Sequence, residues 1–361
     1  MPPLVVFLMT NYNSMRIIDV VKESLKSLAE IDYPRYEVIV ADNASNDGSL
    51  AEIKKTLEKL HMSAKIVYNR RNTGYTGGIN TAYAARRREA KYVAIMNNDF
   101  VINPNTFREL VEIIEQDESI GAVQGIILNH YNRSIIDTSG GVLTGFLKPL
   151  MLCHGEPPPC PQRVVVTSYP EGVFSLIRVK AIQQVNRGLD IVLQPEIFAY
   201  YDDVMLGAQL WNAGYHVVTV PLIVGSHARS ATFRRMNPVQ RYLLIRGHTI
   251  FNEVVKSRYQ GLIRQLLLRG ALLGVIAEKK AYRDPNPWIP SLAVRRGIAL
   301  AKRIIRRIGG ALSLSKIPYI DVDIDEVLLA ATTGLGFNYL KRLHGRKAVA
   351  KIATIYNYKS K

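Results

Sequence analysis

Polar side chains gather directly after three short apolar runs in the first hundred residues. The three clusters occupy residues 10–13, 42–48 and 97–99. Near-continuous apolar runs are typical of buried parallel strands, and such sheets bind ligands beyond the carboxyl ends of their strands. Adjacent carboxylate and amide oxygens suit a hard cation, so residues 97–99 are a candidate site for Mg²⁺ or Mn²⁺. The three clusters are therefore predicted to form one site.

Structural roles explain part of this pattern. Asp47 and Gly48 are typical of a turn, and Ser45 or Asn46 can cap the helix expected after them. A turn explains Asp42 less well, because a carboxylate at the end of a strand can accept hydrogen bonds from a base or a ribose. Each cluster taken alone is a weak signal.

Two further segments and one histidine carry side chains that could bind a ligand or take part in chemistry. Residues 70–80 combine glycines, which let the backbone approach a ligand, with arginines, which pair with phosphate. Their spacing is neither that of a P-loop nor that of a dinucleotide fingerprint. Asp202 and Asp203 follow aromatic residues at an expected helix start, where an apolar wall can raise a carboxyl pKa toward the range of a general base, although the helix dipole alone also favours acids there. His227 follows a strand, but a lone histidine is more often structural.

The elements that must position these residues alternate between strand and helix. Four β-branched runs predict strands and three amphipathic segments predict helices, which in chain order cover residues 4–9, 17–31, 36–41, 49–60, 64–68, 79–88 and 92–96. This alternation predicts an α/β fold in which helices flank a mainly parallel central sheet. Beyond Pro238 the sequence becomes helical and basic, so we place a domain boundary near residue 235.

Composition excludes several protein classes. The 361 residues are 48% hydrophobic and 21% charged, unlike a disordered or collagen-like chain. Two cysteines cannot form a disulfide scaffold, and Cys153, His154 and Cys160 do not complete a zinc site; we expect free thiols or one loop-closing bond. No apolar run approaches the about 20 residues of a spanning helix, and the first residues lack the basic region and cleavage site of a signal peptide. We therefore expect a cytoplasmic protein.

The formal net charge of +17 is concentrated in the last third of the chain. Residues 241–361 contain 23 Lys+Arg and 7 Asp+Glu, which leaves 24 and 23 for residues 1–240. The split indicates one nearly neutral module and one that meets an anionic partner such as a phospholipid surface, a nucleic acid or a phosphorylated substrate. A solvated basic surface would give the same pattern.

If residues 294–308 form a helix, their apolar side chains lie on one face and their basic side chains on the opposite face. This pattern is typical of a helix in a lipid headgroup layer, and equally of a helix packed on the core with a solvated back. Residues 262–276 are apolar almost all round, which implies burial in protein or in the membrane interface. Residues 291–313 contain no aromatic residues between the basic ones, which disfavours binding of single-stranded nucleic acid.

Taken in order, these motifs resemble the family 2 inverting glycosyltransferases with a GT-A fold, in particular the rhamnosyltransferase-like and galactofuranosyltransferase-like branch. The resemblance covers residues 4–250, and the matching residues in this range include Gly172, Arg178 and Gly214. It implies a GT-A (nucleotide-diphospho-sugar transferase) catalytic domain over residues 1–235. Residues 236–361 would then be a basic, mainly helical region that contacts a membrane surface or another protomer.

The resemblance also implies a role for each matching residue. Asp99 holds the last position of the family's DXD-type motif and would bind the divalent metal together with His227. Asp203 matches the final acid of the family's Glu-Asp pair and would be the general base. Because the pair here is Asp202-Asp203, either aspartate could take this role. The residues implied to bind the nucleotide donor are Thr10, Asn13, Asp42, Arg71, Gly74, Asn80 and Asn98.

The implied reaction moves a sugar from a UDP-, dTDP- or GDP-linked donor to a hydroxyl of a glycan or lipid-linked acceptor. A single displacement, assisted by Mg²⁺ or Mn²⁺, would invert the anomeric centre. Lipid-linked acceptors also favour peripheral association with an anionic membrane. The rival interpretations are a catalytically inactive sugar-nucleotide-binding protein and a sugar-nucleotide pyrophosphorylase. The second is disfavoured because residues 10–13 are not a glycine-rich basic loop.

Overall fold

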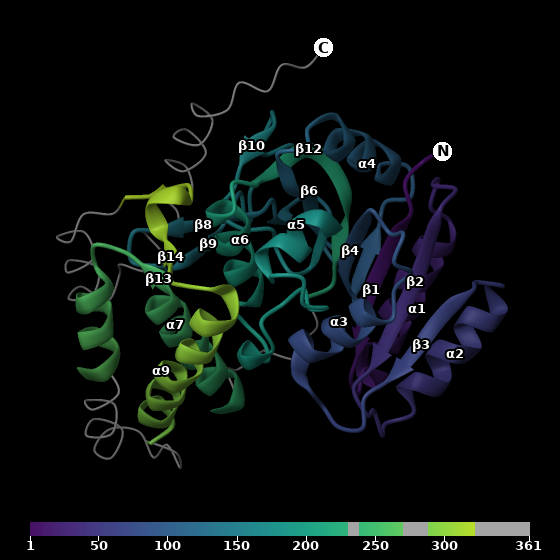
Figure 1. Ribbon diagram of the computed structural model, residues 1–361. Coiled ribbons are helices and arrows are strands. Elements are labelled where there is room, and N and C mark those ends of the chain that lie inside the picture. Colours follow the sequence, from purple (N-terminus) through teal and green to yellow (C-terminus); the bar gives the residue numbers. More distant parts are fainter. Residues whose placement is uncertain (230–237, 270–287, 322–361) are drawn as a thin grey trace.

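The computed structural model describes residues 1–229, 238–269 and 288–321 (Figure 1). Ten strands form one sheet in the order β10-β12-β6-β11-β4-β1-β2-β3, with β5 paired to β12 and β7 paired to β6. The expected α/β class is confirmed. The strands of this sheet are β1 (Val5–Asn11), β2 (Tyr36–Asp42), β3 (Ala64–Tyr68), β4 (Tyr92–Asn97), β5 (Phe100–Ile102), β6 (Ile120–Asn129), β7 (Ile136–Thr138), β10 (Val165–Val166), β11 (Phe174–Arg178) and β12 (His216–His227).

The first four strands are parallel, as the sequence predicts, and helices cover both faces of the sheet (Figure 1). Val5 and Phe7 belong to the hydrophobic core on one face, whereas Val6 and Leu8 belong to the core on the other. Burial on both faces explains why these strands are almost entirely apolar. Helices α1, α2 and α4 supply the first core and α3 and α5 supply the second. The helices are α1 (Ile18–Ala29), α2 (Ser49–Lys59), α3 (Gly74–Ala84), α4 (Phe107–Gln116), α5 (Val179–Val185) and α6 (Asp202–Asn212).

Strand β11 makes the sheet mixed rather than mainly parallel. It runs antiparallel to both of its neighbours, β4 and β6. Beyond it, β12 is parallel to β6 and antiparallel to β5 and β10. A parallel neighbour needs a crossover connection, usually a helix, and no helix lies between β6 and its sheet neighbour β11. The predicted parallel arrangement therefore holds across β1–β4 and for the pair β6 and β12, but not for the sheet as a whole.

Helix α3 begins at Gly74, whereas the sequence predicted a start at residue 79. Glycines weaken a helix in isolation, and the prediction therefore assigned them to a loop. Two contacts explain the difference. The Asn72 side chain accepts a hydrogen bond from the Gly74 N–H at 2.8 Å, and a Cβ on Gly78 would lie 2.4 Å from Thr10 Cγ2. Close packing of α3 on β1 therefore requires a small residue at this point.

The basic third of the chain contains helices α7 (Pro238–Val254) and α9 (Ile289–Ile308), which pack on each other (Figure 1). On the apolar side of α9, Val294 and Ile304 are buried and the other residues are partly buried. Helix α7 supplies Ile250 and Phe251 to the same core as the sheet. Of the two alternatives left open by the sequence, the structure favours a helix that packs on the protein. The basic side of α9 remains at the surface.

Two further expectations about the last third lie only partly within the described residues. Residues 260–269 are helical, with Ile263 buried and Leu266 and Leu268 exposed, whereas residues 270–276 lie outside the described part. The boundary near residue 235 also lies outside it and stays a prediction. In the described ranges, no helix combines the length and apolarity needed to span a bilayer.

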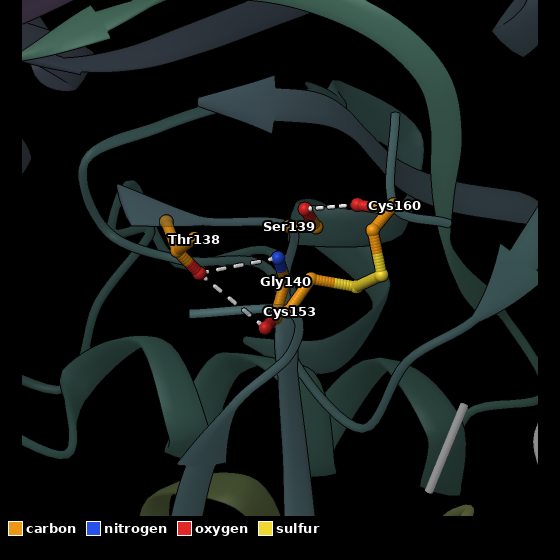
Figure 2. Close-up of a disulfide and its surroundings, with 5 residues drawn as sticks. All are labelled: Thr138, Ser139, Gly140, Cys153 and Cys160. Carbon is orange, nitrogen blue, oxygen red and sulfur yellow. Dashed lines mark hydrogen bonds between the residues drawn. A yellow bond between two sulfur atoms is a disulfide. The ribbon is translucent and has the colours of Figure 1, made fainter. Parts of the chain in front are cut away.

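Cys153 and Cys160 form a disulfide, which is one of the two alternatives left open by the sequence (Figure 2). The bond closes a short loop next to strand β7. Ser139, which follows β7, donates a side-chain hydrogen bond to the Cys160 carbonyl at 2.6 Å, and the Ser139 N–H donates to the Leu152 carbonyl at 3.1 Å. The loop is therefore fastened to the end of β7.

Candidate active site

A pocket of about 390 Å³ lies where strands β1 and β4 end and helix α3 begins. Four of the predicted donor-binding residues line it: Thr10, Asn13, Gly74 and Asn98. Its remaining walls come from Tyr12, Ser14, Arg16, Ile17, Asn43, Asn72, Tyr75 and Phe198. The polar clusters that follow neighbouring strands therefore meet, as the sequence predicts, and their side chains offer hydrogen-bond donors and acceptors to one ligand.

Asp42 lies beside this pocket without lining it. Its carboxylate is buried and accepts hydrogen bonds from Asn11 Nδ2 at 2.8 Å and from the Ser45 N–H at 3.0 Å. Asn11 in turn accepts from Asn98 Nδ2 at 3.5 Å, which links the ends of β2, β1 and β4. In this structure Asp42 fixes the loop after β2, and its neighbour Asn43 faces the pocket.

Arg71 and Asn80, both predicted to bind the donor, do not line the pocket. Arg71 is exposed. Asn80 is buried, and its side-chain oxygen accepts hydrogen bonds from the N–H groups of Val192 and Leu193 at 2.8 and 3.0 Å. The Asn80 amide also donates to the Leu193 carbonyl at 2.7 Å. Asn80 therefore holds the backbone of Val192 and Leu193 in place. This structural role explains why an amide side chain stands at position 80 without any contact to a ligand.

Gly74 forms the closest approach between the two sides of the pocket. Its φ is +76°, and a Cβ at this position would lie 2.4 Å from the Phe198 carbonyl oxygen. Only glycine satisfies both requirements. Phe198 itself begins a strained segment, because Phe198, Tyr200 and Tyr201 all have φ near +65°. Strain of this kind is retained where the surrounding structure fixes it, commonly at functional sites.

Asp202 and Asp203 follow this strained segment at the first turn of α6. Burial and the negative charge of Asp203 raise the pKa of Asp202 to about 8. Asp203 is less buried and accepts hydrogen bonds from the Gly172 N–H at 3.1 Å and the Val204 N–H at 2.8 Å. Burial also raises the pKa of Asp203, while these two hydrogen bonds oppose the rise. The two acids therefore differ in their surroundings. Two backbone N–H groups stabilise the ionised form of Asp203, whereas burial and the charge of Asp203 favour the neutral form of Asp202.

Asp99, which directly precedes β5, and His227, at the end of the neighbouring strand β12, belong to a chain of charged groups. His227 Nε2 lies 3.2 Å from Asp99 Oδ1, and His227 Nδ1 lies 2.9 Å from Asp137 Oδ2. Asp137 Oδ1 pairs with Arg229 Nε at 2.5 Å. Burial opposes a charge on His227, but the hydrogen bonds and charges of the two aspartates outweigh it and raise the pKa of His227 to about 9.

Tyr75 connects these groups to the pocket. Its ring lines the pocket, and its hydroxyl donates to the Gly172 carbonyl at 2.6 Å, while the Gly172 N–H binds Asp203. Burial, followed by the negative charges of Asp202, Asp203 and Asp99, raises the pKa of Tyr75 well above its usual value. Through Gly172, Tyr75 therefore links the pocket to Asp203. That the base candidates, the metal-ligand candidates and the pocket form a single site stays a prediction.

The sequence interpretation missed three residues of this site: Tyr75, Asp137 and Glu171. Tyr75 stood within the glycine-rich segment but received no role. Asp137 is a single acid between Ile136 and Thr138, and such an acid inside a buried strand is itself a signal that could have been used. Glu171 precedes Gly172 and is 9% exposed, and its Oε1 has no hydrogen-bond partner. Burial and the charge of Asp203 raise the pKa of Glu171 to about 8.

Replacing Glu171 by glutamine should stabilise the protein at alkaline pH. Between about pH 4.5 and pH 8 the unfolded chain has an ionised Glu171 and the folded protein has a neutral one, so folding takes up a proton and stability falls as pH rises. Glutamine removes this loss. One pKa unit corresponds to about 1.4 kcal/mol, so Glu171→Gln should raise the melting temperature by several degrees at pH 8.5 and hardly at pH 5.

The control for this experiment is the exposed Glu58→Gln, which removes the same charge without burial. Melting temperatures of the three proteins between pH 5 and pH 9 provide the test. A constant difference between Glu171→Gln and wild type over that range would show that Glu171 does not stay protonated in the folded protein.

The sequence of residues 6–151 matches the profile of Glycosyl transferase family 2. An uncharacterized glycosyltransferase of Haemophilus influenzae is 27% identical over 141 residues, which are 39% of this chain and 40% of that protein. The poly(ribitol-phosphate) beta-N-acetylglucosaminyltransferase TarS of Staphylococcus aureus is 31% identical over 110 residues, which are 30% of this chain and 18% of that protein. The matches thus span less than half the length of these curated relatives.

Solved glycosyltransferases have a similar fold. The mannosyltransferase PcManGT of Pyrobaculum calidifontis, solved with GDP-Man and Mn²⁺, gives a TM-score of 0.52 at 17% identity and covers 98% of this chain and 87% of its own. Residues 1–349 of S. aureus TarS give a TM-score of 0.52 at 16% identity, with coverage of 99% and 93%. At this identity the likeness concerns the fold alone. It shows that the chain has the α/β GT-A fold, and the profile match identifies residues 6–151 as a glycosyl transferase family 2 domain.

Proposed function

We propose that this protein transfers a sugar from a nucleoside-diphosphate sugar to an acceptor hydroxyl, in one metal-assisted displacement that inverts the anomeric centre. The arrangement around Tyr75 carries this proposal. Its ring lines the pocket and lies within the electrostatic reach of Asp99, Asp202 and Asp203. A nucleotide in the pocket would place its diphosphate and sugar toward these acids. The match of residues 6–151 to glycosyl transferase family 2 supports a nucleotide sugar as the donor.

Asp99 and His227 are the residues that would hold a divalent cation. Their facing atoms are 3.2 Å apart, close to the about 3 Å between neighbouring ligands of a cation bound at about 2.1 Å. Within the described residues, no three His, Cys, Asp or Glu side chains form a metal site on their own. Oxygens of the donor diphosphate suit the remaining positions. When bound, the cation would stabilise the negative charge that develops on the diphosphate.

Asp203 is assigned as the general base and Asp202 as its uncharged neighbour. A base must be ionised before it takes the proton of the acceptor hydroxyl. Two backbone N–H groups bind the Asp203 carboxylate, whereas the pKa of Asp202 is raised to about 8 by burial and by the charge of Asp203. At neutral pH the pair therefore has its negative charge mainly on Asp203, next to the pocket.

The donor base stays open between uracil, thymine and guanine, and the acceptor is proposed to be a glycan or a lipid-linked sugar. The similar fold of PcManGT, solved with GDP-Man and Mn²⁺, supports a nucleotide sugar and a divalent metal without choosing the base. The rhamnosyltransferase-like and galactofuranosyltransferase-like branch also stays a prediction. We retain the cytoplasmic location as part of the proposal.

The exposed basic side of α9 supports a peripheral contact with an anionic membrane, through charge rather than insertion. Its exposed cations are Arg295, Arg296, Lys302, Arg303 and Arg306. Arg307 instead pairs with Glu196, with both contacts at 2.5 Å. Flotation of the full chain with phosphatidylserine vesicles should show binding at low salt that is lost as salt rises. Absence of binding at low salt would exclude this contact.

A ligand screen tests the proposed function. Melting temperatures of the full chain would be measured with UDP-, dTDP- and GDP-linked sugars, with and without Mn²⁺. A ligand at about 100 times its Kd adds about 2.7 kcal/mol of stability, so one base should raise the melting temperature by several degrees only when Mn²⁺ is present. Release of the nucleoside diphosphate would then show turnover.

Other outcomes of the screen separate the rivals. Binding without any release of nucleoside diphosphate would favour an inactive sugar-nucleotide-binding protein. Formation of a sugar nucleotide from a nucleoside triphosphate and a sugar phosphate would indicate a pyrophosphorylase. No stabilisation by any of the nucleotide sugars would contradict the proposed function.

A further inference from the structure

Asp137 is the most deeply buried acid of the active-site region, and neither the sequence motifs nor the proposed reaction uses it. It lies in the middle of β7, and its residue is 1% exposed. Both of its side-chain oxygens have charged or polar neighbours: Oδ2 lies 2.9 Å from His227 Nδ1 and Oδ1 lies 2.5 Å from Arg229 Nε. A buried carboxylate is costly unless it is paired in this way.

The contact at Nδ1 decides which nitrogen of His227 can bind a cation. A carboxylate at Nδ1 keeps a proton on that nitrogen, fixes the rotation of the ring and makes the opposite nitrogen a better ligand. That opposite nitrogen, Nε2, lies 3.2 Å from Asp99 Oδ1. Asp137, His227 and Asp99 therefore form a line in which the last two groups face the position of the proposed cation.

The backbone around Asp137 is fixed on both sides. On one side β7 pairs with β6, where Thr138 lies opposite Ile127. On the other side lies the loop closed by the disulfide (Figure 2). The Ile136 N–H donates to the Glu156 carbonyl and the Gly155 N–H donates to the Ile136 carbonyl, both at 2.9 Å. This support holds the side chain of Asp137 at a constant place relative to His227.

We propose that Asp137 is a positioning residue, which holds His227 through Nδ1 so that Nε2 and Asp99 together bind the divalent cation of the donor complex. The inference rests on the proposed function, because it assumes a metal at Asp99 and His227. It goes beyond that function because it assigns to a residue outside every recognised motif the task of preparing the metal site. Arg229, 44% exposed at its side chain, balances the charge of Asp137 from the other side.

A purely structural role for Asp137 makes a different prediction. If Asp137 served only as the partner of Arg229, then Asp137→Asn and Arg229→Gln would both lower stability and neither would change metal binding. If Asp137 positions His227, then Asp137→Asn should weaken metal binding more than Arg229→Gln does, because only the first substitution removes the carboxylate from Nδ1. The two substitutions on one ion pair therefore form a matched comparison.

The experiment measures the binding of Mn²⁺ to the full chain by electron paramagnetic resonance, in which free Mn²⁺ gives the signal. Loss of a carboxylate behind a ligating histidine typically costs about 10–100-fold in metal affinity, so Asp137→Asn should raise the Kd for Mn²⁺ by about that factor. Asp99→Asn, which removes a ligand, should have a larger effect. Asp190→Asn, at an ion pair with Arg86 outside the site, should have none.

The outcomes separate this inference from the proposed function. Wild-type affinity in Asp137→Asn together with weak binding in Asp99→Asn would overturn the positioning role and leave the metal site intact. Wild-type affinity in both would remove the metal site itself. If Asp137→Asn does not fold, the double variant Asp137→Asn/Arg229→Gln replaces it, since removal of both members of an ion pair is milder than removal of one. The same 10–100-fold loss is expected there, and unchanged affinity would again overturn the role.

Discussion

Replacing Asp203 by asparagine should lower the rate of nucleoside diphosphate release by about 10²–10⁴-fold, which is the usual contribution of a general base. Asparagine has the same shape but cannot take the proton of the acceptor hydroxyl. Its side-chain oxygen can still accept the hydrogen bond from the Gly172 N–H, which binds Asp203 at 3.1 Å in the wild type. We therefore expect binding of the donor, measured as its Mn²⁺-dependent thermal shift, to change little.

Asp202→Asn is the matched control for this prediction. Asp202 is next in sequence, but its pKa of about 8 keeps it neutral at pH 7, so the same substitution changes little charge there. We expect a fall in rate of less than about tenfold. A rate loss in Asp202→Asn with full activity in Asp203→Asn would reverse the assignment of the two acids. Full activity in both variants would show that neither aspartate is the base.

Replacing Asp99 by asparagine should abolish the Mn²⁺-dependent part of donor binding and lower turnover by at least about 100-fold. The proposed metal site has only two side-chain ligands, so the loss of one charged oxygen removes half of the protein's contribution. Without the cation, the negative charge that develops on the diphosphate is no longer stabilised. The thermal shift of the variant with donor should therefore be the same with Mn²⁺ and with EDTA.

The control for Asp99→Asn is Asp19→Asn, which removes an exposed carboxylate from α1. It should keep the full difference between Mn²⁺ and EDTA. A Mn²⁺-dependent shift that persists in Asp99→Asn would place the metal elsewhere or show that the donor binds without one.

The parallel half of the fold and the convergence of the site were predictable from the sequence, for one reason. Strands buried on both faces are almost wholly apolar, so their ends are visible, and parallel strands bring those ends to one edge of the sheet. The gathering of Thr10, Asn43 and Asn98 around one pocket follows from this. The direction of β11 was not predictable, because direction depends on how the chain returns to the sheet rather than on the composition of the strand.

Individual roles were less predictable than positions. Asn80 matched a motif, yet its side-chain oxygen accepts hydrogen bonds from the backbone of Val192 and Leu193. No sequence pattern predicts such a contact. Asp137 was missed for the opposite reason, because one acid in a three-residue strand has no periodicity and gains meaning only when β7 is placed beside His227. Side-chain contacts across 90 residues of sequence depend on packing, which local patterns do not encode.

The most direct test of the proposed metal site is anomalous X-ray scattering. The crystals would contain the full chain with Mn²⁺ and the nucleoside diphosphate of the preferred donor. The proposed function predicts one strong manganese peak within about 2.4 Å of both Asp99 Oδ1 and His227 Nε2, with diphosphate oxygens completing the coordination. A manganese ion bound to the diphosphate with neither side chain among its ligands would contradict the proposed metal site.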